Sequence, residues 1–191
     1  MKGIDVSWHN GFIDWQAVKN AGIEFAICRC AYGKIADETF QQNVQGAHAF
    51  GLKCGAYHYS YALTPNDAII EAKICKDIIA ESGVLLELPV FFDMEDADGY
   101  KKHNNFVFTK RNVTDICKKY LENIYPLNCG IYASYNYLEY VIDWRSLNCP
   151  IWNAQWSEND FIQGFMWQFT DRLLIGDKLF DGNILYEDKD K

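Results

Sequence analysis

Two carboxylates near the middle of the chain have the spacing that acid–base chemistry needs. Asp93 and Glu95 follow the apolar run 89–92 and are separated by Met94. Side chains alternate along a β-strand, so the two acids share one face and lie about 5–7 Å apart, close enough to separate their pKa values. Glycoside hydrolysis uses such a pair, with one carboxyl protonated and one ionised. The spacing also fits an acidic loop after a strand, or a divalent-metal site.

Two further acids extend this candidate set. Asp5 lies in the apolar segment 3–7, where a charge costs several kcal/mol unless it is paired or functional. Capping of the following turn explains it equally well. Asp181 begins an Asp-Gly-Asn sequence, which is typical of hairpin turns, and composition alone favours that interpretation.

The segments that would position these acids alternate between strand-like and helix-like patterns. Strands are predicted at 3–7, 24–32, 53–62, 88–96, 129–134, 150–156 and 164–170, with an antiparallel piece near 179–186. Helices are predicted to begin near Asp14, Asp37 and Thr64, and one amphipathic helix covers about residues 111–125. This alternation predicts a mainly parallel sheet covered by helices.

Eight strands with only about five helices indicate an incomplete (β/α) barrel, with a doubly wound sheet as the alternative. The connection 155–164 is too short for a crossover helix. In a barrel, the acids at the carboxyl ends of strands would meet at the mouth, where active sites form. We expect a single domain over residues 1–186, followed by a polar tail at 187–191.

Composition narrows the range of partners. The net charge of −8 argues against nucleic acid, which rewards basic patches. No apolar run approaches membrane-spanning length, so membrane insertion is not expected. Aromatic residues make up 16% of the chain, enough to fill a core and equally able to line a groove for the apolar faces of sugars. We expect a monomer.

The remaining reactive residue types form no recognisable site. The seven cysteines lie mostly in apolar segments without CxxC or Cys/His spacing, which predicts buried free thiols rather than disulfides or a metal site. The histidines are scattered, and no nucleophile elbow or phosphate-binding loop is present. No cofactor and no metal are therefore expected.

A series of motifs, in order along nearly the whole chain, resembles the family-25 glycoside hydrolases. These are the N-acetylmuramidases (lysozymes) of phage endolysins and bacterial autolysins. The motifs are GIDVS (3–7), NG (10–11), IDW (13–15), GIEFAI (22–27), GAYHY (55–59), PVFFDME (89–95), GIYAS (130–134), IWNAQW (151–156), WQF (167–169) and DGN (181–183).

The resemblance implies an irregular, flattened TIM-like (β/α) barrel and hydrolysis of the β-1,4 bond between N-acetylmuramic acid and N-acetylglucosamine in peptidoglycan. By position, Glu95 would be the general acid and Asp93 its ionised partner. Asp93 would either stabilise an intermediate formed by the substrate's acetamido group or assist water. Asp5 and Asp181 match two further groove acids that help keep Glu95 protonated, which overrides the turn interpretation of Asp181.

The resemblance also places five residues along the groove: Tyr57, Tyr132, Trp152, Gln155 and Trp167. Tyr59 shares a strand face with Tyr57, so both are expected there. Arg29, a cation within a strand, is expected either to pair with a groove acid or to face solvent at the barrel rim. Core packing is the alternative for these aromatic residues, above all for Trp156 and Phe169.

Two other functional classes stay open at this point. A catalytically silent peptidoglycan- or sugar-binding domain would keep the groove but has no use for an acid pair. A metal-dependent deacetylase on a similar barrel would need a histidine pair, which the sequence does not offer. Because the N-terminus enters a strand without a signal peptide, we expect synthesis in the cytoplasm and action on the bacterial cell wall after lysis or non-classical export.

Overall fold

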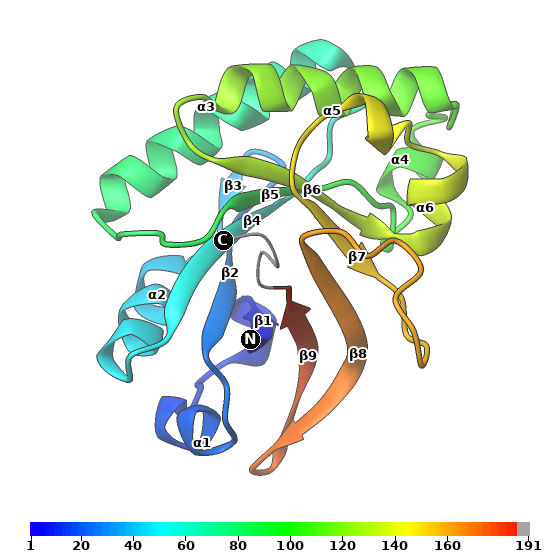
Figure 1. The fold of residues 1–191 in the computed structure, drawn as a ribbon. Coiled ribbons are helices and arrows are strands. Elements are labelled where there is room, and N and C mark those ends of the chain that lie inside the picture. Colours follow the sequence, from blue (N-terminus) through cyan, green and yellow to red (C-terminus); the bar gives the residue numbers. More distant parts are fainter. Residues whose placement is uncertain (187–191) are drawn as a thin grey trace.

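Nine strands form one sheet, and eight of them close into a barrel because β1, at one edge of the sheet, also pairs with β2 (Figure 1). The computed structural model describes residues 1–186, and the predicted polar tail at 187–191 lies outside them. The strand order is β1-β9-β8-β7-β6-β5-β4-β2-β3, with β1 paired to β2. The strands are β1 (Lys2–Val6), β2 (Phe25–Tyr32), β3 (Ile35–Ala36), β4 (Lys53–Tyr59), β5 (Val90–Asp93), β6 (Cys129–Ser134), β7 (Ile151–Ala154), β8 (Met166–Ile175) and β9 (Lys178–Leu185).

Helices cover only part of the barrel, as the sequence predicts. The described residues form α1 (Trp15–Asn20), α2 (Phe40–Ala49), α3 (Pro65–Ser82), α4 (Tyr100–His103), α5 (Lys110–Ile124), α6 (Tyr135–Tyr140) and the 3₁₀ turns η1 (Trp8–Asn10) and η2 (Trp144–Ser146). Long helices α3 and α5 lie together across one side of the sheet (Figure 1). Thr64 caps α3 in a reciprocal capping box with Asp67, at the predicted position.

The short helices differ from the prediction. Helices α4 and α6, of four and six residues, are too short to show a helical period in the sequence. Asp37 was expected to cap α2, but the N-cap is Thr39, whose backbone N–H and hydroxyl both donate to Asp37. The connection between β7 and β8 contains no helix, as its length predicts. The irregular barrel prediction is confirmed.

The barrel is closed by an antiparallel strand. Strands β1, β2 and β4 to β8 pair in parallel, whereas β9 runs antiparallel to both β8 and β1. The β8–β9 turn lies at Gly176 and Asp177, where Gly176 has φ 61°, a conformation that favours glycine. The turn that composition alone favours at Asp181 is therefore wrong: Asp181 lies within β9, directly opposite Asp5.

Strand β5 separates two cores. Phe92 and Met94 belong to the large cluster between sheet and helices, and Phe91 belongs to the cluster inside the barrel with Trp152 and Met166. Asp93, two residues after Phe91, therefore points into the barrel, as alternation predicts. The strand ends at Asp93, however, and does not continue to residue 96.

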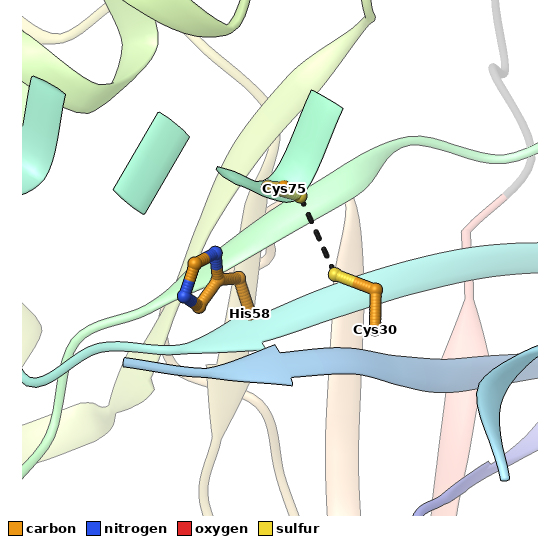
Figure 2. Close-up of side chains that lie close together, drawn as sticks. All are labelled: Cys30, His58 and Cys75. Atoms are coloured by element: carbon orange, nitrogen blue, oxygen red, sulfur yellow. Dashed lines mark hydrogen bonds between the residues drawn. The ribbon is translucent and has the colours of Figure 1, made fainter. Parts of the chain in front are cut away.

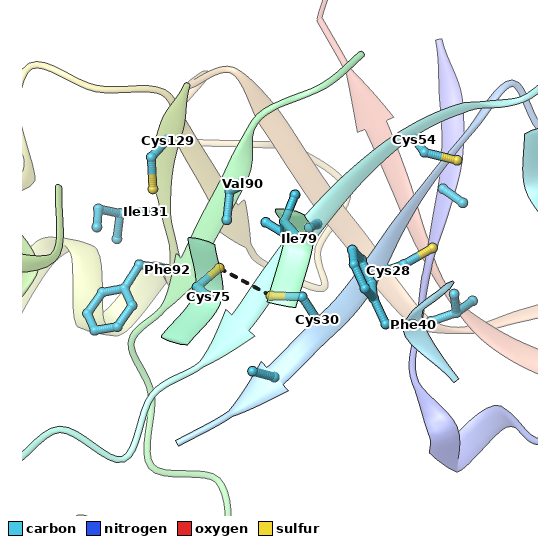
Figure 3. Packing of buried hydrophobic residues seen from close by; sticks show 14 of the residues in the cluster. Cys28, Cys30, Phe40, Cys54, Cys75, Ile79, Val90, Phe92, Cys129 and Ile131 are labelled. Carbon is cyan, nitrogen blue, oxygen red and sulfur yellow. Dashed lines mark hydrogen bonds between the residues drawn. The ribbon is translucent and has the colours of Figure 1, made fainter. Parts of the chain in front are cut away.

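The cysteines are core residues. All seven are free and six are buried, which confirms the predicted thiols. Figure 3 shows several of them between the strands and the covering helices, among side chains such as Phe40, Ile79 and Phe92. Within residues 1–186, no helix has the length and apolar character needed to cross a membrane.

Candidate active site

Four acids meet in a pocket of about 410 Å³ at the mouth of the barrel, which we call the central pocket. Asp5 comes from β1, Asp93 from the end of β5, Glu95 from the segment after it, and Asp181 from β9. Asp5 and Asp93 meet here because parallel strands end at the same rim of a barrel, and the antiparallel pairing of β9 with β1 brings in Asp181, 176 positions from Asp5. The structure thus brings together the whole predicted catalytic set.

Asp93 and Glu95 occupy different environments. Asp93 is only 3% exposed, and its Oδ1 is enclosed without a hydrogen-bond partner among the described residues. Glu95 lies beyond the end of β5 and is more open to solvent, so the pair is not carried by one strand as predicted. The strand therefore fixes Asp93 alone, and the chain that follows it places Glu95.

Burial dominates the electrostatics of the pair. It raises the pKa of Glu95 to about 7, against the lowering effect of the Lys101 cation and with a further increase from Asp181. Burial and the neighbouring Glu95 charge also raise the pKa of Asp93 well above its usual range. The two groups titrate together, and these directions do not single out Asp93 as the ionised member. They do keep Glu95 protonated close to neutral pH.

Asp5 and Asp181 face each other across the β1–β9 ladder. The pair is asymmetric: Asp5 disfavours ionisation of Asp181, whereas a hydrogen bond with Asp181 favours the ionised form of Asp5. Burial raises the pKa of Asp5 to about 6, although hydrogen bonds from neighbouring amides oppose the increase. Burial and the charge of Asp5 raise the pKa of Asp181 to about 8. The pocket therefore holds acids that gain negative charge one after another across the neutral range.

Two amides that the sequence did not indicate as site residues hold Asp5. Gln168 Nε2 and Asn183 Nδ2 donate to Asp5 Oδ2 over 3.0 and 2.7 Å. Asn183 in turn accepts a hydrogen bond from Trp152 Nε1, and Gln168 accepts one from the Tyr132 hydroxyl. Their positions in the sequence could have indicated them as site residues. Both belong to the motifs of the family resemblance, and Asn183 shares a strand face with Asp181.

Most of the predicted groove residues border the central pocket: Arg29, Tyr57, Tyr59, Tyr132 and Trp152. Trp152 is buried and packs edge-on against Tyr57 and Tyr132, which makes these three rings the aromatic floor of the pocket. Arg29 is buried and pairs with Asp37, with Nε and Oδ2 2.8 Å apart. Neither alternative for Arg29 holds, because its partner is outside the acid set and it does not face solvent.

The remaining predicted groove residues lie around the loop after β7. Gln155 borders a hollow next to the central pocket, whereas Trp167 lines neither and instead donates from Nε1 to the Gln155 carbonyl oxygen at 2.7 Å. Trp156, for which core packing was the main alternative, is 62% exposed and lines both cavities. The exposure of a residue just after the end of β7 is not visible in a sequence that shows only an aromatic residue near a strand.

Two hollows, which share no lining residue with each other, adjoin the central pocket and extend it into a groove. One, of about 510 Å³, shares His9, Arg29 and Tyr59 with the central pocket and adds the aromatic rings of Trp8, Tyr32 and Tyr61. The other, of about 410 Å³, shares Glu95, Tyr132 and Trp156 with it and adds polar groups from residues 134–136. Glu95 therefore lies within an elongated groove lined by aromatic rings, which suits a chain of sugars.

A cysteine–histidine cluster lies away from the groove. The sulfur atoms of Cys30 and Cys75 are 3.3 Å apart, and a nitrogen of His58 lies within 4.8 Å of both (Figure 2). No sequence spacing indicated this group, since its members come from β2, β4 and α3. All three side chains are fully enclosed, and the His58 nitrogens already contact the Gly33 carbonyl oxygen and the Tyr120 hydroxyl. The cluster is thus a hydrogen-bonded part of the core.

Comparison with solved structures supports the same fold. The modular autolysin from Streptococcus pneumoniae, solved with a synthetic peptidoglycan ligand, superposes with a TM-score of 0.88 at 22% identity over 97% of this chain and 46% of its own. A family 25 glycosyl hydrolase from Bacillus anthracis gives a TM-score of 0.79 at 22% identity, covering 99% of this chain and 90% of its own.

Sequence comparison agrees with the structural one. The autolytic lysozyme of Clostridium acetobutylicum is 27% identical over 92% of this chain. The aligned region spans only 58% of that relative's length. The family model described as glycosyl hydrolases family 25 matches residues 4–177, which include Asp5, Asp93 and Glu95. The chain belongs to family 25 of the glycosyl hydrolases.

Proposed function

We propose that this chain is a muramidase that hydrolyses the β-1,4 bond between N-acetylmuramic acid and N-acetylglucosamine in peptidoglycan. The observation that carries the proposal is the position of Glu95. In a family 25 member, a carboxyl group with a pKa raised to about 7 lines an aromatic-lined groove, beside a second buried carboxyl. The pneumococcal relative solved with a peptidoglycan ligand supports this choice of substrate.

In the proposed reaction, Glu95 donates its proton to the glycosidic oxygen as the bond to the anomeric carbon breaks. The departing sugar leaves as an alcohol, and Glu95 is left as a carboxylate. That carboxylate then removes a proton from water as the water oxygen bonds to the anomeric carbon, which restores the acid. Burial supports the first step because it keeps the proton on Glu95 until the leaving oxygen takes it.

Asp93 has two possible roles, and its surroundings favour one. An enclosed carboxyl oxygen without a hydrogen-bond partner is costly, and an N–H group of the substrate would relieve that cost. The acetamido group next to the scissile bond carries such an N–H. We therefore assign Asp93 to orienting this acetamido group, whose carbonyl oxygen can stabilise the anomeric carbon. Direct assistance to water is the alternative.

Loss of turbidity of purified peptidoglycan tests the proposal. Wild type should clear the suspension, and Glu95→Gln should not, since the amide has no proton to donate at the required acidity. Sedimentation with the walls should show that both proteins still bind. If Glu95→Gln clears as fast as wild type, the assignment of the acid is wrong. If wild type binds walls without clearing them or releasing new reducing ends, the chain is a silent sugar-binding domain.

A further inference from the structure

A buried lysine lies directly behind the proposed acid. Lys101, in α4, is only 1% exposed, and its Nζ donates to the main-chain oxygen atoms of Glu95, at 2.7 Å, and of Ser60, at 2.5 Å. Both acceptors are neutral carbonyl groups. Burying an ammonium group is costly, and burial lowers the pKa of Lys101. A hydrophobic residue would fill the same space without this cost. The buried ammonium group must therefore contribute something that a hydrophobic side chain cannot.

The contribution of Lys101 is seen where the hydrogen-bond ladder between β4 and β5 ends. In a parallel pair, N–H groups of the two strands donate alternately, and here the Ser60 N–H donates to the Asp93 carbonyl at 3.0 Å. The next bond in this register would run from the Glu95 N–H to the Ser60 carbonyl. Among residues 1–186 that bond is not formed, and the Ser60 carbonyl accepts from Lys101 instead. The ammonium group thus bridges the two main chains at the point where they separate.

The loop from Glu95 to Lys101 is held together by hydrogen bonds of its own. The carboxylate of Asp96 accepts from the backbone N–H of Lys101 at 2.6 Å and from that of Lys102 at 3.1 Å. Gly99, at φ 74°, turns the chain into α4. Residues 95–101 therefore form a compact loop whose two ends are joined by the Lys101 side chain. Displacing that side chain would free the main chain that carries Glu95.

Charged groups surround both Lys101 and Glu95. Lys101 is influenced by Asp93 of β5, Glu71 of α3, and Asp96 and Asp98 of its own loop, and its Nζ lies 6.0 Å from the centre of the Tyr59 ring of β4. Glu95 is influenced by Lys101, by Asp181 of β9, and by Asp93 and Asp98. Lys101 is the cation among the groups that act on Glu95, and its charge lowers the pKa of that acid.

We propose that Lys101 is a positioning residue that replaces a ladder hydrogen bond, holds Glu95 off the strand and toward the groove, and sets the pH range over which Glu95 can donate its proton. The proposal rests on the proposed function in taking Glu95 as the acid. It has two separable parts: the hydrogen bonds orient the main chain, and the positive charge favours the ionised carboxylate. Loss of the lysine should therefore change both the rate and the pH profile.

Lys101→Met removes both the charge and the hydrogen bonds at similar length. The maximal rate of wall clearing should fall about tenfold or more because the acid is misplaced. The alkaline limb of the profile should move upward by about one pH unit, because Glu95 holds its proton more tightly without the cation. Lys101→Arg, which keeps the charge, should leave the limb near its wild-type position. Lys102→Met, an exposed neighbour in the same helix, is the matched control. A folded Lys101→Met protein with the control's profile would overturn the proposal.

A measurement on the unmodified lysine covers the case in which Lys101→Met does not fold. The ¹⁵N chemical shift of the Lys101 ammonium group, followed by NMR against pH without substrate, should change as Glu95 ionises near pH 7. The change should be clearly smaller in Glu95→Gln, where only the other acids of the pocket still ionise. A Lys101 signal that stays constant through this range contradicts the proposal. Because no substrate is present, this result is independent of whether the walls are cleaved.

Discussion

Replacing Glu95 by glutamine is expected to make the protein more stable at neutral pH while it abolishes wall lysis. The reason is that a buried carboxyl group resists ionisation in the folded state. Burial raises the pKa of Glu95 from 4.5 to about 7. In the unfolded chain the same group ionises near 4.5, so folding above that pH costs free energy that a neutral glutamine does not incur.

The sign and size of this effect follow from proton linkage. Between pH 4.5 and about 7 the folded state binds more protons than the unfolded state, so stability decreases as the pH rises and then stays constant. The difference of about 2.5 pH units corresponds to a cost on the order of 3 kcal/mol, at about 1.4 kcal/mol per unit. Glu95→Gln should therefore match wild type near pH 4.5 and exceed it by roughly this amount near pH 8.

Urea unfolding followed by the fluorescence of the six tryptophans measures the comparison. Free energies of unfolding are needed for both proteins at about pH 4.5 and about pH 8. Glu81→Gln, which changes an exposed glutamate in the last turn of α3, is the matched control and should show no such dependence. A gain in stability that is equal at both pH values, or a loss near pH 8, would refute the reasoning from burial.

Three further substitutions test other parts of the site. Trp156→Ala should raise KM for glycan fragments about tenfold through lost stacking, with the melting temperature unchanged because the ring is exposed; a change in stability without a change in KM would contradict its place in the groove. Asn183→Ala should lower both activity and stability, the latter by about 1–3 kcal/mol in chemical denaturation, because Asp5 and the Trp152 N–H lose a partner; Asn20→Ala, at the exposed end of α1, is its control. Arg29→Met should cost about 3–5 kcal/mol because the buried Asp37 carboxylate loses its cationic partner and keeps only neutral donors, and adding Asp37→Asn should recover part of that loss; no recovery would mean that the pair is not the cause.

Much of this site can be predicted from local sequence, because its parts depend on strand alternation. Asp93 faces the barrel interior since Phe91 does, and a charged residue in an apolar strand marks Asp5 as a candidate site residue. The position of Asp181 needed the family resemblance. Its Asp-Gly-Asn sequence has turn chemistry, but Gly176 takes the turn and pairing with β1 keeps Asp181 in a strand.

Features that depend on long-range contacts could not be predicted. The ion pair of Arg29 with Asp37, the amide clamp on Asp5 and the enclosure of Lys101 each join segments that local patterns treat separately. Trp156 and Trp152 lie four residues apart in one motif, yet one is exposed at the groove and the other is buried in its floor. Side-chain type and spacing do not distinguish them, because the course of the loop after β7 decides their exposure.

The chemical identity of the new reducing end tests the central claim most directly. Purified peptidoglycan is digested, the products are reduced with borohydride, and the reduced sugar is identified by mass spectrometry. Muramidase action predicts reduced N-acetylmuramic acid with wild type and none above background with Glu95→Gln. Reduced N-acetylglucosamine, or solubilised wall without any new reducing end, would contradict the proposed reaction.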